Sequence, residues 1–86
     1  MRRSKLQVYL NILKTLADNG KLNSTHITYH TYLNHKSLSE CLEFLMKNNL
    51  VTETELQSRK KYQITSLGIK TLQIANKIDK ELKTFN

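Results

Sequence analysis

The middle of this chain constrains the fold most, because it predicts a short helix, a tight turn and a longer helix without a break. Ser24 or Thr25 is the expected cap of the short helix, since hydroxyl side chains accept hydrogen bonds from the free N–H groups of a helix start. The turn follows near Tyr32. In this turn we expect Leu33 to be buried and Asn34 to cap the next helix.

That next helix is predicted from residue 35 to about residue 48. Its buried stripe recurs at three- and four-residue steps and consists of Leu38, Cys41, Leu42 and Leu45. Charged side chains share the same spacing on the opposite side, namely Lys36, Glu40, Glu43 and Lys47. The stripe predicts a helix that packs on a core and exposes a polar outer surface.

Two strands are predicted next, at residues 50–55 and 61–65, from their Thr and Val content and the Tyr62/Ile64 alternation. Residues 56–60 form the expected turn, with Arg59, Lys60 and Lys61 at its tip. Helix, turn, helix and hairpin in this order predict a winged helix-turn-helix, a mainly α fold with a small β-hairpin.

Helices are also predicted on both sides of this core. In residues 4–19, capped by Ser4 and ended by Gly20, one face carries Leu6, Tyr9, Leu10, Leu13, Leu16 and Ala17. The last helix, residues 66–85, is longer than a domain of this size needs. Its apolar seam consists of Leu67, Thr71, Ile74, Ile78, Leu82 and Phe85.

Such a seam indicates a partner helix, so residues 1–65 are predicted to form the winged helix-turn-helix unit and residues 66–86 to form a homodimer. Ile69 and Leu72 lie off the seam and are expected to pack on the body of the domain. If the last helix instead folded back on its own domain, the protein would be a monomer.

Charge indicates the kind of partner. The 86 residues carry a net charge of +7, distributed as +5 over residues 1–36, −3 over residues 37–58 and +5 over residues 59–86. A positive face made from the two ends favours nucleic acid. No apolar run approaches the ~20 residues of a membrane span and no signal peptide is recognisable, so a cytoplasmic, nucleoid location is expected.

Motifs across nearly the whole chain carry a family resemblance. They are Arg2-Arg3-Ser4-Lys5, Thr25-His26-Ile27, Tyr29, Leu33-Asn34-His35-Lys36, Leu38, Leu42, Leu45, Leu50-Val51 and Tyr62-Gln63-Ile64-Thr65-Ser66-Leu67-Gly68. Together they resemble the small archaeal winged-helix DNA-binding proteins that dimerise through a C-terminal antiparallel coiled coil. The resemblance implies duplex DNA binding, a homodimer, and a nucleoid-associated or transcriptional role.

In this fold the N-terminal half of the second helix of the motif meets base edges, while the wing and flanking basic residues hold phosphates. The candidates for base contacts are His35, Lys36, Ser37 and Glu40. The alternative is that Lys36 and Glu40, like Glu43 and Lys47, are ion pairs on a solvated face.

The candidates for phosphate contacts are Arg2, Arg3, Lys5, Thr25, Tyr29, Arg59, Lys60 and Lys61. Their alternative is an ordinary solubilising charge run, and for Tyr29 it is packing. A winged helix used as a protein–protein interaction module, with the acidic middle segment as its docking surface, is the alternative for the function as a whole.

Neither a metal site nor a catalytic constellation is expected. His26 and His30 are four residues apart and His35 and Cys41 follow, but no CxxC motif or suitably placed carboxylate accompanies them. Cys41 lies within an apolar helical pattern and is expected to be a small core residue. We therefore expect no enzyme activity, no cofactor and no small-molecule substrate.

Overall fold

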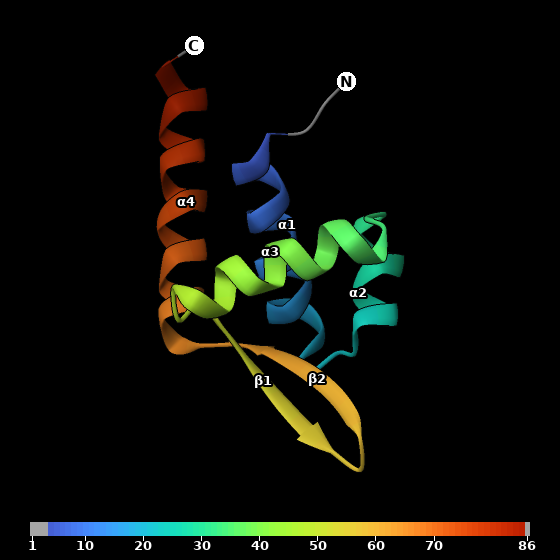
Figure 1. Cartoon of the computed structure of the whole chain (residues 1–86). Coiled ribbons are helices and arrows are strands. Elements are labelled where there is room, and N and C mark those ends of the chain that lie inside the picture. The colour runs from blue at the N-terminus through green and yellow to red at the C-terminus, as the bar shows by residue number, and fades with distance from the viewer. Residues whose placement is uncertain (1–3, 86) are drawn as a thin grey trace.

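The computed structural model describes residues 4–85 of the chain, and the side chains as far as Lys83. Its elements follow the predicted order (Figure 1). They are α1 (Lys5–Asn19), α2 (Ser24–Thr31), α3 (His35–Lys47), β1 (Val51–Leu56), β2 (Arg59–Ile64) and α4 (Ser66–Phe85). Four helices with a two-stranded antiparallel hairpin confirm the predicted winged helix-turn-helix.

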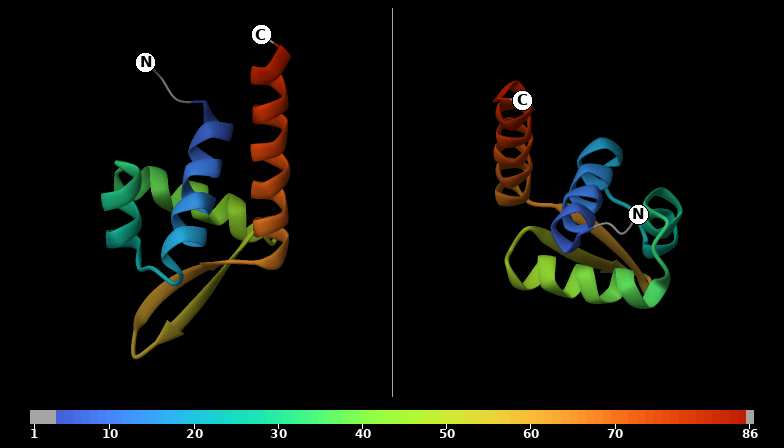
Figure 2. Two further views of the ribbon diagram at one scale, coloured as in Figure 1. Left: turned by 180° about the vertical axis from the view of Figure 1, so that it is seen from behind. Right: turned by 90° about the horizontal axis from the view of Figure 1, so that it is seen from above.

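The molecule is elongated, with principal extents of 50 × 29 × 21 Å. Figure 1 and the view from behind in Figure 2 show the hairpin projecting from one end, with the first turn of α1 and the last turn of α4 at the other end. α3 crosses in front of α1, and the tip of the hairpin lies on the same side of the molecule as the N-terminal end of α3.

Side-chain caps define the helix starts. Ser4 accepts a hydrogen bond from the Gln7 N–H at 3.1 Å, and Asn34 accepts one from the Ser37 N–H at 2.7 Å, as predicted. The prediction of Ser24 or Thr25 as the cap of α2 was wrong. Asn23 is extended, and its side chain accepts a hydrogen bond from the His26 N–H at 2.9 Å. The helix therefore begins at Ser24, one residue earlier than a Ser24 cap would allow.

The core lies where α1, α2 and α3 meet the base of the hairpin. Its buried side chains are Ile12, Leu13, Leu16, Ile27, Leu38, Leu42, Leu45 and Val51. Cys41 and Leu33 are only half-buried against this cluster. Leu6 and Ala17, which share the apolar face predicted for α1, are exposed.

The hairpin turn is tighter than predicted. β1 pairs with β2 in the register Val51↔Ile64 through Leu56↔Arg59, so only Gln57 and Ser58 connect the strands. Both have positive φ, 53° and 64°, the conformation that matches the twist of a two-residue hairpin. Arg59 and Lys60 therefore belong to β2, where their side chains point to opposite faces of the hairpin.

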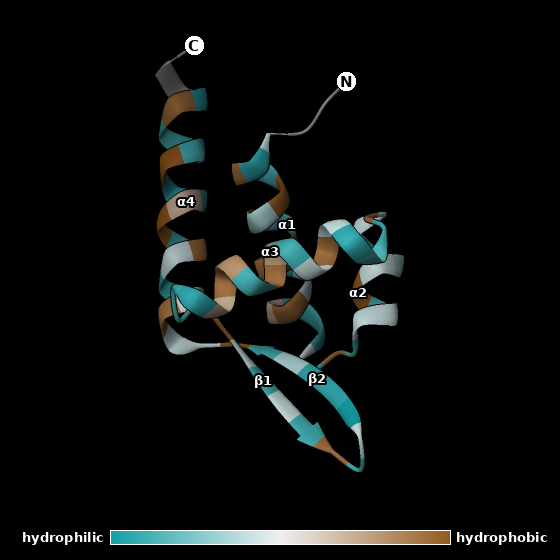
Figure 3. Ribbon diagram, viewed as in Figure 1, coloured by the Kyte–Doolittle hydropathy of each residue, from teal (hydrophilic) through white to brown (hydrophobic). Residues whose placement is uncertain are grey.

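α4 begins against the body and then leaves it. Gly68 is buried and Leu72 packs against the core, whereas Ile69 is 42% exposed, so only Leu72 packs on the body as predicted. Further along α4, hydrophobic residues recur at intervals beyond its contact with the core (Figure 3). Besides Ile69, the large apolar side chains of α4 that are exposed among the described residues are Leu67, Ile74, Ile78 and Leu82.

Candidate nucleic-acid interface

Two of the predicted base contacts, His35 and Lys36, are exposed in the first turn of α3. The other two, Ser37 and Glu40, lie on the flank of α3 that faces α1. With Lys5, Val8 and Tyr9 of α1, and with Leu33 and Cys41, they line a half-open hollow of about 390 Å³. The start of α1 is at the end of the molecule opposite the wing (Figure 1). Ser37 and Glu40 are therefore turned away from the wing.

The opposite flank of α3 carries two residues that were not among the predicted base contacts. Ser39 and Glu43 are exposed and lie three and seven residues after Lys36, so these three side chains form one stripe along the helix. Because Ser37 and Glu40 face the start of α1, this second stripe is the one directed toward the wing. Helical spacing joins Lys36 to Glu43 and to Glu40 alike, so spacing alone could not tell the two flanks apart.

Charged side chains on α3 are not engaged with one another. Within residues 4–83, ion pairs join Lys14 to Asp18, Lys60 to Glu53, and Lys83 to Asp79. The pairs suggested by sequence as the alternative, between Lys36 and Glu40 and between Glu43 and Lys47, do not form among the described residues. The outer surface of α3 thus presents free donors and acceptors.

Cys41 is one of the residues that line the hollow between α1 and α3. Burial raises the pKa of its thiol, the charge of Glu40 raises it further, and the charge of Lys5 lowers it. A thiol with a raised pKa is mostly protonated at neutral pH and is a poor nucleophile. We therefore interpret Cys41 as a packing residue that lines the hollow, and not as a reactive thiol.

The wing is stabilised on the side that faces the core. Lys60 forms an ion pair with Glu53 at 3.7 Å. Burial raises the pKa of the Tyr62 hydroxyl, and the neighbouring Glu53 raises it further through its charge and a hydrogen bond. Tyr62 also pairs with the connection between α1 and α2, since its N–H donates to the Leu22 carbonyl at 2.8 Å and its carbonyl accepts from the Leu22 N–H at 3.0 Å.

The remaining predicted phosphate contacts are spread over the molecule. Arg2 and Arg3 lie outside the described residues. Lys5 is exposed in the first turn of α1, and Thr25 is exposed near the start of α2. Tyr29 is 78% exposed and meets His30 edge to face at 5.7 Å between ring centroids. Tyr29 therefore does not pack in the core, the alternative that its sequence position left open.

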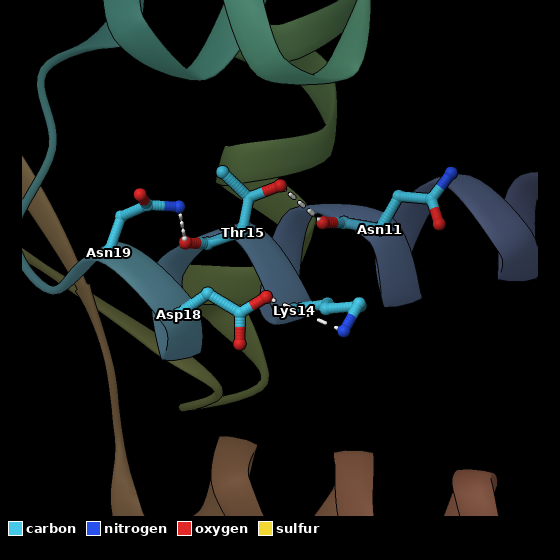
Figure 4. A network of polar contacts seen from close by, with 5 residues as sticks. All are labelled: Asn11, Lys14, Thr15, Asp18 and Asn19. Atoms are coloured by element: carbon cyan, nitrogen blue, oxygen red, sulfur yellow. Dashed lines mark hydrogen bonds and ion pairs between the residues drawn. The ribbon is translucent and has the colours of Figure 1, made fainter.

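The polar stretch of α1 is satisfied within the helix (Figure 4). Thr15 donates to the Asn11 carbonyl, and Asn19 donates to the Thr15 carbonyl, each at 2.8 Å. Lys14 and Asp18 form an ion pair of 3.4 Å beside them. Because these groups bond to one another, the surface they form is a solvated helix face.

An apolar trough runs beside α4. A hollow of about 430 Å³ between the start of α1 and the outer half of α4 is lined mainly by Leu6, Leu10, Ile74, Ala75, Ile78 and Leu82. Through Leu6, Leu10 and Thr71 it continues into a second hollow of about 260 Å³, whose other walls include Phe44 and Tyr9. Tyr9 and Phe44 stack at 4.5 Å, joining α1 to α3.

A family model described as a winged helix-turn-helix matches residues 2–83, nearly the whole chain. The chain belongs to the winged helix-turn-helix family. No group of three or more metal-binding side chains occurs within the described part of this winged helix, and none of its described helices is long and apolar enough to cross a membrane. A comparison with curated proteins returns no match.

Solved structures share the fold of this winged helix. Sso10a-2, a DNA-binding protein from Sulfolobus solfataricus, is 22% identical with a TM-score of 0.78, over 95% of this chain and 87% of that one. BpsR of Bordetella bronchiseptica, whose DNA binding is regulated by 6-hydroxynicotinic acid, is 15% identical with a TM-score of 0.84, over 93% of this chain and 60% of that one.

NadR, in complex with 4-hydroxyphenylacetate, is 25% identical with a TM-score of 0.75, over 91% of this chain and 58% of that one. This chain therefore spans about three-fifths of the length of BpsR and NadR, and most of the length of Sso10a-2.

Proposed function

We propose that this protein binds double-stranded DNA as a homodimer and acts as a transcriptional regulator or nucleoid-associated protein. The observation that carries the proposal is the common orientation of α3 and the wing, whose tip lies on the same side as the start of α3 (Figure 1). In a winged helix these two elements occupy a groove and the adjacent backbone. Family membership and the DNA-binding neighbours Sso10a-2 and BpsR support it.

Base contacts are assigned to the exposed residues at the start of α3 and on its wing-directed stripe. His35 and Lys36 begin this surface, and Ser39 and Glu43 continue it. A lysine donates to guanine, and a carboxylate accepts from a cytosine amino group. Ser37 and Glu40, which the sequence also predicted as base contacts, line the hollow beside α1 and are left out of this assignment.

Dimerisation is assigned to α4, with residues 1–65 as the DNA-binding unit and residues 66–86 as the dimerisation unit. Ile74, Ile78 and Leu82 are each at least half exposed in the single chain, and a helix of this kind buries such a stripe against a second helix. Leu67 and Thr71 continue the stripe toward the body. The trough beside α4 offers apolar surface of the same character. The predicted contribution of Phe85 lies outside the described side chains.

The proposal is tested by fluorescence anisotropy with a random duplex of ~30 bp, titrated at several salt concentrations, because every neutralised phosphate adds roughly 0.9 to the salt slope. Steep salt dependence on duplex DNA supports the proposal. Absence of binding at low salt contradicts it as a general activity and favours the protein-interaction alternative. Selection from a random-sequence pool then measures how strongly α3 discriminates between sites.

A further inference from the structure

The wing has two faces of different charge. Residues directly opposite each other in an antiparallel pair point to the same side of the sheet. The inner face, continuous with buried Val51 and Ile64, carries Glu53, Glu55, Lys60 and Tyr62. The outer face carries Thr52, Thr54, Leu56, Arg59, Lys61 and Gln63. Both carboxylates of the hairpin are thus on the inner face, and two of its three cations are on the outer face.

A third cation reaches the outer face from a distant part of the sequence. Leu22 pairs with Tyr62 through two backbone hydrogen bonds, so the connection between α1 and α2 runs as a short third strand beside β2. Continued antiparallel from Leu22, this pairing places Lys21 on the outer side, across from Gln63, and Lys21 lines the same hollow as Lys61. These residues meet in a hollow of about 280 Å³ lined by Lys21, Thr54, Leu56, Gln57, Arg59 and Lys61.

The hollow has the composition of an anion site. Its three cations form no ion pair with any described residue, whereas Lys60, one position away on the inner face, is bound to Glu53. Like charges side by side are unfavourable until an anion lies between them. The Thr54 hydroxyl is an additional donor, and exposed Leu56 offers apolar surface at the edge of the hollow.

From this arrangement we infer that the outer face of the wing is a phosphate site for the duplex backbone, in which Lys21 acts together with Arg59 and Lys61. The sequence predicted that Arg59, Lys60 and Lys61 all hold phosphate. Lys60 does not belong to the site on the outer face. The inference rests on the proposed duplex binding and specifies which face of the wing meets DNA. It joins residues about forty positions apart in sequence into one site.

The test compares single-charge removals on the two faces in the full chain. Lys21→Ala, Arg59→Ala and Lys61→Ala are each titrated against the same random duplex over a salt series. Each variant is expected to weaken binding at low salt and to lower the salt slope by about 0.9, the contribution of one phosphate contact. All three side chains are exposed, so circular dichroism spectra are expected to match those of the wild type.

The matched control is Lys60→Ala combined with Glu53→Gln, which removes the inner ion pair without changing the net charge and retains an acceptor for Tyr62. Its slope is expected to equal that of the wild type. A Lys21→Ala slope equal to the wild type, or a loss in the control as large as that in Lys61→Ala, would overturn the outer-face site while duplex binding itself remained established. Failure of the wild type to bind duplex at low salt would overturn both proposals together.

Discussion

The Thr65 hydroxyl donates a hydrogen bond to the backbone carbonyl of Asn49 at 2.7 Å, and it accepts one from the Gly68 N–H at 2.9 Å. The Thr65 N–H also donates to the Leu50 carbonyl at 3.0 Å. One residue thus caps α4 and fixes it to the bend between α3 and β1. The wing, α3 and α4 are joined at this point, so their relative orientation depends on it.

Removing that hydroxyl should loosen the junction. Thr65→Val keeps the shape of the side chain but loses both hydrogen bonds, and we expect it to lower the free energy of unfolding by about 1–2 kcal/mol. Thr65→Ser keeps the hydroxyl and is expected to stay close to the wild type. Urea denaturation at one fixed protein concentration measures both. Equal stability of the two variants would show that the hydrogen bonds do not matter.

Gly68 is required by close packing. A Cβ atom at this position would lie 2.3 Å from the Leu50 carbonyl oxygen and 2.6 Å from Cγ1 of Ile64, so the start of α4 would have to move. We expect Gly68→Ala to destabilise the protein by about 1–3 kcal/mol, although alanine favours helices. Gln73→Ala, at an exposed position of the same helix, is the control and should change stability by less than about 0.5 kcal/mol. Thermal denaturation of both variants decides whether packing or propensity dominates.

Two glutamates on α3 distinguish its flanks. Glu43 lies on the wing-directed stripe and Glu40 borders the hollow with α1. Each Glu→Gln change removes one negative charge and should raise general affinity for DNA to a similar degree. Only Glu43→Gln is expected to change the preferred sequence, by about 1–3 kcal/mol at one base pair. Sites selected from a random pool by each variant provide the measurement, and a shift with Glu40→Gln alone would reverse the assignment.

The apolar stripe of α4 predicts the oligomeric state. Ile78→Lys places a charge among exposed apolar side chains, and we expect it to convert a dimer into a monomer. Gln73→Lys adds the same charge on another side of the helix and should leave the dimer intact. Sedimentation at micromolar concentration separates the two masses. A wild-type species of about 10 kDa, the mass of one chain, would contradict the dimer directly.

The reactivity of Cys41 should follow its surroundings. Because burial and Glu40 raise the pKa of the thiol, little thiolate is present at neutral pH, and iodoacetamide should react more slowly than with the unfolded chain. The rate should increase as the pH rises toward the thiol pKa. Glu40→Gln should accelerate the reaction and Lys5→Gln should slow it. Mass spectrometry of the alkylated protein gives the rates, and the opposite order would contradict the assigned causes.

Much of the fold was predictable because it depends on local rules. The caps Ser4 and Asn34, the stop at Gly20 and the core stripe of α3 each follow from neighbouring residues and the helical repeat. Where local rules gave two similar candidates, as at Ser24 and Thr25, the prediction was wrong. Asn23 was the cap because the chain is already helical at Ser24.

Tight connections were less predictable. Nothing in the sequence of Gln57 and Ser58 indicates the left-handed conformation that both adopt, since neither is Gly or Asn. The strand register imposed it, and with it the separation of Arg59 from Lys60. The candidate site changed accordingly, because a cluster of three consecutive basic residues in the sequence became two opposite faces of a hairpin.

By itself the sequence determined the order of helices and strands, the buried leucines of α3 and the excess of positive charge. These features depend on side-chain type and on spacing within one element. Only the tertiary structure decided which charges share a surface. It placed Lys21 beside Arg59 and Lys61, paired Lys60 with Glu53, and turned Ser37 and Glu40 toward α1. Packing between elements sets these relationships, and they cannot be predicted from the spacing of residues along the chain.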